Sequence, residues 1–261
     1  MKKYIVLLFL LFFSFGLSGC INKNKQPDDL KSIIERGYII VGVKADSPPF
    51  GYFEDKQRKG IDVEIAKEIA AYIFKDTSED HIEFVNVDAQ NRISKLNAKE
   101  VDILVATVSI NDKRKLVIDF SRPYFYTNTK IMVKKDSKID NLQYFNSKGK
   151  LGVVMGTTGE KLARNLAPNV CLIGAKTYDE AFNFLKENKV DAILGDDIIL
   201  SQFKNSNFKI INRTYSREDY GVAVRKSEAS ANLLNEINIV ISALLDDKNF
   251  NLIKTEQMLN K

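Results

Sequence analysis

The stretch YIIVGVKADSPPFGYFEDKQRKGIDVEIAKEIAAYIF, residues 38–74, joins a predicted buried strand to a predicted helix. Residues 38–43 form a continuous apolar run with β-branched side chains, which is typical of a strand in a parallel sheet. After a loop that contains proline and glycine, apolar residues recur at helical spacing at Ile61, Ile65, Ile69 and Ile73. The stretch therefore predicts the first strand–loop–helix unit of an α/β fold.

The same alternation continues along the chain. Further strands are predicted at 83–87, 103–108, 151–155, 192–194 and 220–224, and helices at 90–97, 160–166, 178–186, 198–203 and 229–245. Repeated strand–helix–strand units favour α/β sheets with right-handed crossovers. The pattern occurs as two small α/β units, so we expect two lobes that face each other across a cleft. The first lobe is expected at 31–126 and 217–261, the second at 127–216, with a hinge near 124–130 and 213–220.

The amino terminus has the order of a secretory signal peptide. Two lysines follow Met1, residues 5–13 are almost entirely apolar, and Leu17-Ser18-Gly19-Cys20 closes the segment. The cysteine after small residues resembles the lipobox of bacterial lipoproteins. We therefore expect a signal peptide at 1–19, a lipid on Cys20 and a tether at 20–30; the alternative is a plain secretory signal. No later stretch reaches the ~20 apolar residues that a membrane span needs.

Charge, cysteine and histidine content exclude several function classes. Removal of the signal peptide takes away two lysines and lowers the formal net charge from +5 to +3, with both signs interspersed. A nucleic-acid-binding protein would show a concentrated basic patch. Cys171 lies in an apolar run and is expected to be a buried, inert thiol. His81 is the only histidine, so we expect neither histidine-based catalysis nor a metal or other cofactor.

Four groups of segments resemble one family when they are taken together. They are 41–52 with 60–64, 102–114, 118–124, and 156–158 with 190–196. Their order, spacing and residue identities resemble those of the extracellular solute-binding proteins of polar amino-acid ABC importers. The resemblance implies the type II periplasmic-binding-protein fold, with two lobes joined by a two-stranded hinge. It also implies a monomer that binds an amino acid and an ABC permease, and that faces the periplasm or the cell exterior from a lipid-anchored position on the membrane.

The resemblance also assigns ligand-binding residues. Residues at matching positions hold the ligand's α-carboxylate and amine from the first lobe, add a carboxylate contact from the second lobe, or pair with the α-ammonium. They are Phe50, Ala106, Thr107, Ser109, Arg114, Thr158 and, for the ammonium, Asp196. The residues agree with this assignment, because Asn111 is a good helix N-cap and the Arg114 guanidinium fits a carboxylate bidentately. Two alternatives stay open. Arg114 could be an ordinary surface arginine, and Asp196 could cap a helix while Asp197 takes its place at the ligand.

Ligand specificity is argued from charge. Lys44 ends the first strand, where the family senses the ligand side chain, and Arg92 resembles the arginine that binds a distal carboxylate. Lys44, Arg92 and Arg114 against Asp196 give the predicted site a net charge of +2. A bound glutamate or aspartate lowers this charge more than a neutral or basic amino acid does. Ser47 and Ala89 replace aromatic stacking positions of relatives that bind basic or neutral amino acids.

Alternatives to this charge argument stay open. Lys44 could extend to solvent, and Arg92 could pair with Asp88. Members that bind cysteine or cystine also carry an Asn-Arg pair at this place, so another polar ligand fits. Asp62 and Glu64 are expected to cap or decorate the first helix, or to neutralise Lys44.

Two other functions compete with amino-acid capture. Cyclohexadienyl dehydratases are similar to this family, but such an enzyme needs a general acid in the cleft. The motifs place no carboxylic acid there apart from Asp196, so we expect a binding protein and not an enzyme. A sensory or adhesin role of the same binding module is the other alternative.

Overall fold

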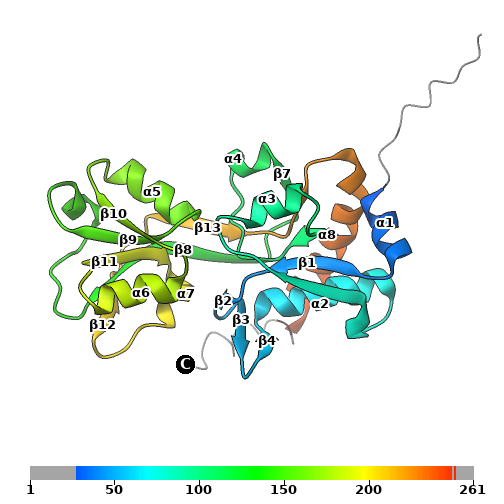
Figure 1. Ribbon diagram of the computed structural model, residues 1–261, viewed down its shortest axis with the longest axis horizontal. Coiled ribbons are helices and arrows are strands. Elements are labelled where there is room, and N and C mark those ends of the chain that lie inside the picture. Colours follow the sequence, from blue (N-terminus) through cyan, green and yellow to red (C-terminus); the bar gives the residue numbers. More distant parts are fainter. Residues whose placement is uncertain (1–27, 249, 251–261) are drawn as a thin grey trace, which may run out of the picture.

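The computed structural model describes residues 28–248 and 250. The predicted signal peptide, Cys20 and most of the tether lie outside these residues. No helix in the described part of the chain is both long and apolar enough to cross a membrane. The described residues form two α/β lobes side by side, each with its own central sheet (Figure 1).

The first lobe is built on a five-stranded sheet with the order β5-β1-β6-β14-β7. β1 pairs in parallel with β5 and β6, whereas β14 runs antiparallel between β6 and β7. The strand bounds are β1 Ile39–Val43, β5 Ile82–Asn86, β6 Ile103–Leu104, β7 Ile118–Phe120 and β14 Ala223–Arg225. A small second sheet carries β2 Asp46–Ser47, β3 Gly51–Glu54 and β4 Gln57–Lys59.

Helices cover this sheet because their apolar faces are buried against it. The helices are α1 Asp29–Arg36, α2 Ile61–Phe74, α3 Arg92–Asn97, α4 Asp112–Lys115 and α8 Ala231–Asp246, with 3-10 turns η1 Glu79–His81 and η3 Glu228–Ser230. α2 buries Ile61, Ile65 and Ile69, the positions that the helical spacing identified. The side chain of Asp28 caps α1 by accepting hydrogen bonds from the backbone N–H groups of Leu30 and Lys31.

The second lobe has a sheet in the order β10-β9-β11-β8-β12, and β13 also pairs with β8. Its strands are β8 Phe125–Lys134, β9 Lys150–Val154, β10 Cys171–Ala175, β11 Ala192–Asp196, β12 Phe208–Ile210 and β13 Ser216–Tyr220. Its helices are η2 Leu142–Asn146, α5 Thr158–Leu166, α6 Tyr178–Lys186 and α7 Asp197–Ser201. Thr157 and Thr177 begin α5 and α6 through side-chain caps.

The chain connects the lobes through an antiparallel ribbon. β8 and β13 pair over five residues each, from Phe125 opposite Tyr220 to Thr129 opposite Ser216, and Figure 1 shows them running from one lobe toward the other. This ribbon coincides with the hinge segments expected from sequence. The expected lobe boundaries at 126/127 and 216/217 fall within β8 and β13 and remain a prediction.

Several expected elements are confirmed and others need correction. Helices 61–74 and 178–186 have the predicted bounds. The strand expected at 103–108 is only β6, because Thr107 takes a left-handed backbone conformation with φ of 49°. The strand expected at 220–224 is divided between β13 and β14, which belong to different sheets. Cys171 is exposed, not buried, because β10 is an edge strand.

Candidate functional site

The sequence-predicted residues converge where the two lobes meet. Loops after β1 and β6 and the start of α4 come from the first lobe, and the β9–α5 and β11–α7 junctions come from the second. Contact between the lobes is direct, since the Arg114 guanidinium donates to the Gly156 carbonyl oxygen at 3.4 Å. Carboxyl ends of strands in facing α/β units are the usual place for a ligand site.

Arg114 is held by its own lobe and reaches toward the other. The Asn111 side chain caps α4 by accepting a hydrogen bond from the Arg114 backbone N–H at 3.0 Å, as the sequence predicted. The guanidinium donates to the Ser109 carbonyl oxygen at 2.8 Å. Burial, and then the nearby charge of Arg92, lowers the pKa of Arg114 to about 9, so the group is a cation at neutral pH. A desolvated guanidinium with free N–H groups suits a carboxylate.

The segment from Ala106 to Ser109 lies beside this cation. Its three predicted site residues are buried, and Thr107 has a positive φ that a β-branched residue rarely adopts. The Thr107 N–H donates to the carboxylate of Asp62 at 3.0 Å, and the Tyr124 hydroxyl donates to the other oxygen of that carboxylate at 2.8 Å. Asp62 is thus a buried acceptor that holds the loop, and not an exposed helix cap.

Arg92 supports the same loop from the side. Its buried guanidinium donates from Nη1 to the carbonyl oxygens of Ala106 and Thr107, the latter at 3.1 Å. Asp88 instead accepts hydrogen bonds from Gln90 and Asn91, so the alternative of an Arg92–Asp88 pair is wrong. Among the described residues, Arg92 Nε has no hydrogen-bond partner. A buried N–H group without a partner is uncommon in folded proteins.

Lys44 is fully enclosed, so the alternative that it extends to solvent is wrong. Its side chain is 2% exposed and its ammonium lies 3.3 Å from the Asp46 carboxylate, with a hydrogen bond to the Ser47 hydroxyl. The ring of Tyr178, from the second lobe, lies 5.5 Å from the ammonium. Burial lowers the pKa of Lys44, and the charge of Asp46 opposes that shift.

The Asp196 carboxylate lies at the candidate site, whereas the Asp197 carboxylate bonds to residues of β8. The Asp196 carboxylate accepts a hydrogen bond from the Tyr220 hydroxyl, and burial raises its pKa to about 6. Asp197 instead accepts hydrogen bonds from Thr127 and Asn128 and pairs with Lys130 at 3.1 Å, all on β8. Asp196 stands at the N-cap position of α7, but its side chain makes no capping hydrogen bond. Its role toward a ligand remains a prediction.

Phe50 and Thr158 complete the predicted set. Phe50 is buried and makes edge contacts with Phe125 at 4.9 Å and Tyr220 at 5.3 Å, so it joins the first lobe to the hinge ribbon. Thr158 is the first residue of α5, next to the cap Thr157. Backbone N–H groups at such a helix start can donate to an anion.

Sequence reasoning missed four residues that belong to this arrangement: Asp46 and the tyrosines Tyr124, Tyr178 and Tyr220. Asp46 lies in the two-residue strand β2, which is too short to show a periodic pattern. The tyrosines are far apart in sequence and only the fold brings them together. Pairing Asp46 with Lys44, two residues away, would have lowered the net charge expected for the site from +2 to +1.

The corrected charge count removes the expected excess of +2. Lys44, Arg92 and Arg114 are matched by the carboxylates of Asp46, Asp62 and Asp196. The charge of Glu218, which is buried at the hinge, also acts on Arg114 and Asp196. The site is therefore close to neutral or slightly acidic when these carboxyls are ionised.

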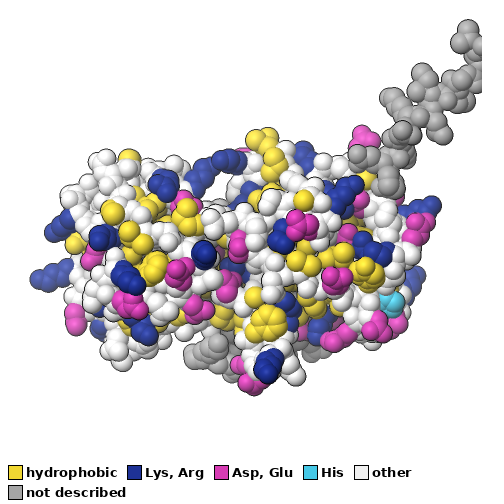
Figure 2. Space-filling view, in the orientation of Figure 1, with side chains coloured by type: hydrophobic (Ala, Val, Ile, Leu, Met, Phe, Trp, Pro, Cys, Tyr) yellow, Lys and Arg dark blue, Asp and Glu magenta, His cyan; other side chains and the backbone are white. Residues whose placement is uncertain are grey.

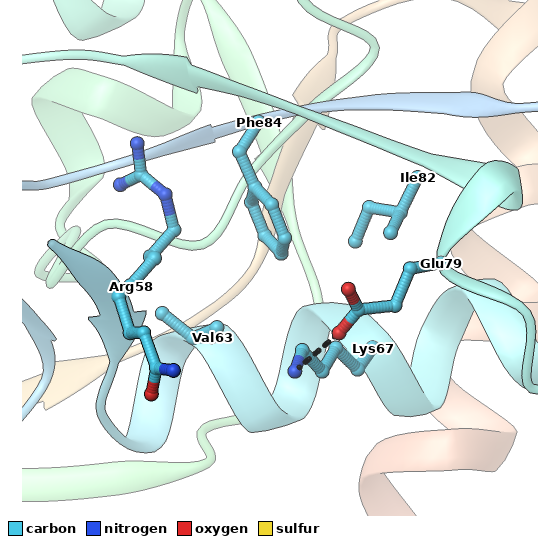
Figure 3. Close-up of a pocket in the computed structure, with 7 residues that line it drawn as sticks. Arg58, Val63, Lys67, Glu79, Ile82 and Phe84 are labelled. Carbon is cyan, nitrogen blue, oxygen red and sulfur yellow. Dashed lines mark ion pairs between the residues drawn. The ribbon is translucent and has the colours of Figure 1, made fainter.

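A separate surface pocket of about 440 Å³ lies on the first lobe between β4, α2 and β5 (Figure 3). The Lys67–Glu79 ion pair, at 3.0 Å, closes one side of it. On the other side, the Arg58 guanidinium lies 5.3 Å from the Phe84 ring and donates to the Lys44 carbonyl oxygen at 3.4 Å. This pocket holds none of the predicted ligand residues, although Arg58 steadies the backbone of one of them.

The chain is similar to known proteins over most of its length. Residues 39–258 match the family described as bacterial extracellular solute-binding proteins, family 3. The ABC transporter glutamine-binding protein of Bacillus subtilis is 32% identical over 94% of this chain and 89% of its own length. A glutamine-binding protein of Geobacillus stearothermophilus is 35% identical over 86% of this chain and 93% of its own length.

A solved structure gives the same result for the fold. The crystal structure of a cysteine-binding protein from Campylobacter jejuni superposes with a TM-score of 0.83 at 28% identity, covering 89% of this chain and 94% of that one. The α/β two-lobed periplasmic-binding-protein fold expected from the sequence is thereby confirmed. These relatives are named as binding proteins, in agreement with the expectation of a non-enzymatic protein.

Proposed function

This chain belongs to the bacterial extracellular solute-binding proteins of family 3, and from that membership we propose that it captures a free polar amino acid outside the cytoplasmic membrane and delivers it to an ABC importer. The observation that carries the proposal is the presence of a desolvated cation, Arg114, on one side of the lobe contact and a desolvated acid, Asp196, on the other. Arg114 suits the ligand's α-carboxylate, and Asp196 suits its α-ammonium. Because the two come from different lobes, one zwitterion can hold the lobes closed.

We propose an uncharged polar side chain for this ligand, with glutamine as the first choice. The Lys44–Asp46 pair neutralises the cation that the sequence assigned to an acidic side chain. An additional carboxylate in a site already near neutrality would be desolvated without a full counter-charge, at a cost of several kcal/mol. The names of the Bacillus and Geobacillus relatives, which specify glutamine, support the same choice.

Glutamate or aspartate, the ligand expected from sequence, is the second candidate. The unpartnered Nε of Arg92 favours a ligand that ends in a good acceptor. A side-chain carboxylate accepts there as well as an amide oxygen does. Cysteine or cystine is a further alternative, supported by the Campylobacter structure.

A thermal-shift screen of the mature chain against the twenty amino acids and cystine tests the proposal. A ligand at 100 times its dissociation constant adds about 2.7 kcal/mol to the free energy of unfolding. A shift largest with glutamine supports the proposal as stated. A shift confined to glutamate or aspartate keeps the family function and replaces the ligand, and no shift with any amino acid contradicts the function itself.

Arg114→Ala tests the site assignment by titration calorimetry with the ligand that the screen identifies. Removal of the α-carboxylate partner is expected to lower the affinity by about 3 kcal/mol, or ~100-fold. Lys113→Ala, a change at the exposed neighbouring residue, is the matched control and should bind normally. Unchanged affinity in Arg114→Ala would show that the ligand lies elsewhere.

We also propose that the mature chain is held at the membrane by a lipid on Cys20. The sequence order of apolar run, small residues and cysteine supports this. Mass spectrometry of the protein purified from membranes should find a chain that begins at Cys20 and carries acyl groups. A chain cleaved elsewhere, or released from cells without lipid, would contradict the anchor and leave the amino-acid-binding function intact.

A further inference from the structure

One contact crosses the lobe boundary beside the candidate site. Lys44 directly follows β1 in the first lobe, and the ring of Tyr178, the first residue of α6 in the second lobe, lies 5.5 Å from its ammonium. α6 also contacts β2, and Figure 1 shows β2 on the side of the first lobe that faces α6. In Figure 2 the two lobes touch along much of their boundary on this face of the molecule. We call the Lys44–Tyr178 contact the closing contact.

The Tyr178 ring is held in place by its own lobe. The Thr177 side chain caps α6, so Tyr178 stands in the first turn of that helix. The Tyr178 hydroxyl oxygen accepts a hydrogen bond from the Asp196 backbone N–H at 3.4 Å. The ring also packs on the backbone of Gly195, because a Cβ at Gly195 would lie 2.5 Å from the ring atom Cε1. Tyr178 therefore moves with the second lobe, and it approaches Lys44 only as the lobes approach each other.

Lys44 benefits from a partner on the second lobe because closure removes its ammonium from water. The Lys44 side chain is 2% exposed when the lobes are together. Asp46 and Ser47 contact the ammonium from the first lobe. A cation is attracted to the negative face of an aromatic ring, and this attraction is stronger where water is excluded. The Tyr178 ring therefore offsets part of the desolvation that Lys44 undergoes when the lobes close.

We propose that Tyr178 is a positioning residue that couples lobe closure to the charge on Lys44. The inference rests on the proposed function, because an amino acid held between Arg114 and Asp196 brings the same two lobes together. Since Lys44 and Tyr178 belong to different lobes, the closing contact forms only in the closed protein. It stabilises that form and thereby raises the affinity for any ligand that binds it. The ammonium is already held by Asp46 and the ring, so closure does not require a charged ligand side chain at Lys44.

Fluorination of the ring tests the closing contact with little change of shape. Fluorine withdraws electron density and so weakens the negative face of the ring. Tyr178→Phe and the mono-, di- and trifluorinated phenylalanines at position 178 are made in chains that start at residue 21, with and without Lys44→Met. Titration calorimetry with the ligand that the screen identifies measures the affinity. We expect the affinity to fall stepwise, by about tenfold over the series, where Lys44 is present, and to change by less than about twofold in Lys44→Met.

Three further substitutions separate the closing contact from other effects. Tyr178→Leu removes the ring and should weaken binding at least as much as the trifluorinated ring. Tyr178→Phe alone loses only the hydroxyl and should bind within about threefold of the unsubstituted chain. Phe53→Leu is the matched control, because it removes a ring that lies 4.6 Å from the Arg58 guanidinium within the first lobe, and it should not change the affinity. A fluorinated series that is flat, or that falls equally in Lys44→Met, would overturn the proposal.

Resonance energy transfer between the lobes distinguishes failure of the closing contact from failure of the proposed function. Cys171 is exposed in the second lobe, and Glu68→Cys adds a second label at an exposed position of α2 in the first lobe. Transfer, measured with and without ligand, should be lower in Tyr178→Leu than in the labelled chain that keeps Tyr178. That difference in a protein that binds no amino acid would support the closing contact and contradict amino-acid capture. Equal transfer with normal ligand binding would overturn the closing contact alone.

Discussion

At the scale of single residues, the site combines buried charges that hold one another in place. Lys44 is paired within its own turn, Arg92 donates to backbone carbonyls, and Asp62 accepts from a backbone N–H. These three groups hold in place the side chains and backbone that border the cleft. Arg114 and Asp196, in contrast, have capacity left for the charged ends of an amino acid.

Asp46 is expected to exclude acidic ligands by neutralising Lys44. In Asp46→Asn the buried ammonium loses its counter-charge at 3.3 Å, so a ligand carboxylate becomes the better partner. We expect the ratio of glutamate to glutamine affinity to rise about tenfold, which corresponds to ~1.4 kcal/mol. Titration calorimetry with both ligands measures this ratio. Asp55→Asn, at an exposed turn, is the control, and an equal change in both variants would refute the role of Asp46.

Binding is expected to weaken in acid because of Asp196. The ligand's ammonium needs the ionised carboxylate, and burial raises the Asp196 pKa from 3.8 to about 6, with Glu218 acting in the same direction and Lys44 and Arg92 against it. Affinity should therefore be level above pH 7 and should fall by up to about tenfold per pH unit below pH 6. Calorimetry between pH 5 and 8 tests this, and a flat profile in the wild type would contradict it.

The same pKa shift has the opposite sign for folding of the unliganded protein. A carboxyl whose pKa is raised on folding binds a proton more tightly in the folded state. Its stabilisation is complete below pH ~4 and is lost as the pH rises through about 6. Asp62, whose pKa burial also raises to about 6, contributes in the same direction.

At the scale of elements, one helix start determines the conformation of the binding loop. Asp62, in the first turn of α2, accepts from the Thr107 N–H and the Tyr124 hydroxyl. Asp62→Ala leaves both donors buried without an acceptor, so we expect the free energy of unfolding to fall by about 2–3 kcal/mol. Ligand affinity should fall as well, because Thr107 then loses the contact that holds its positive φ.

Urea unfolding and calorimetry of Asp62→Ala measure the two effects. Glu64→Ala changes the same turn of α2 at a partly exposed side chain and is the control. Loss of stability with full ligand affinity would mean that Asp62 supports the core but does not position the loop. Normal stability would contradict the buried hydrogen bonds themselves.

How far the sequence predicted these elements depends on whether a pattern was local. α2 and α6 were predicted with their observed bounds because their signals are local: an apolar stripe along α2, and the Thr177 cap at the start of α6. β6 was predicted too long because a left-handed residue inside an apolar run leaves no mark on periodicity. Cys171 was misplaced because the exposure of an edge strand depends on strand order, which the composition of β10 does not contain.

The residues of the candidate site likewise divide into those linked by a local pattern and those that only the fold brings together. Arg114 and its cap Asn111 were found because they are three residues apart. Tyr178 near Lys44 comes from α6, Tyr124 at Asp62 lies just before β8, and Tyr220 at Asp196 ends β13, so no local pattern links them. The roles of the predicted site residues toward a ligand remain predictions.

At the scale of the whole molecule, closure depends on a close backbone approach between the lobes. Gly156, with φ of 80°, lies against Ala89, and a Cβ at Gly156 would be 2.6 Å from the Ala89 carbonyl oxygen. Gly156→Ala is therefore expected to keep the lobes apart and to weaken ligand binding, by about 2 kcal/mol or ~30-fold. Small-angle scattering should show a smaller ligand-induced compaction than in the wild type.

Gly149→Ala is the matched control for this prediction. Gly149 has φ of 83° in the same lobe, and its nearest neighbours are the side chains of Tyr144, Asp191 and Phe145 within that lobe. It carries the same left-handed backbone cost without a contact between lobes. If both substitutions weakened binding equally, backbone strain and not lobe contact would be the cause.

The position of β14 sets an order of assembly during synthesis. The strands of the second lobe are complete once residue 220 has emerged, but β14, at Ala223–Arg225, lies between β6 and β7 in the first lobe's sheet. A chain of which only the first 220 residues have emerged therefore has every strand of the second lobe's sheet and a gap in the sheet of the first lobe. The first lobe is synthesised first, but its sheet is completed last. The chain therefore stays incompletely folded until almost all of it has emerged.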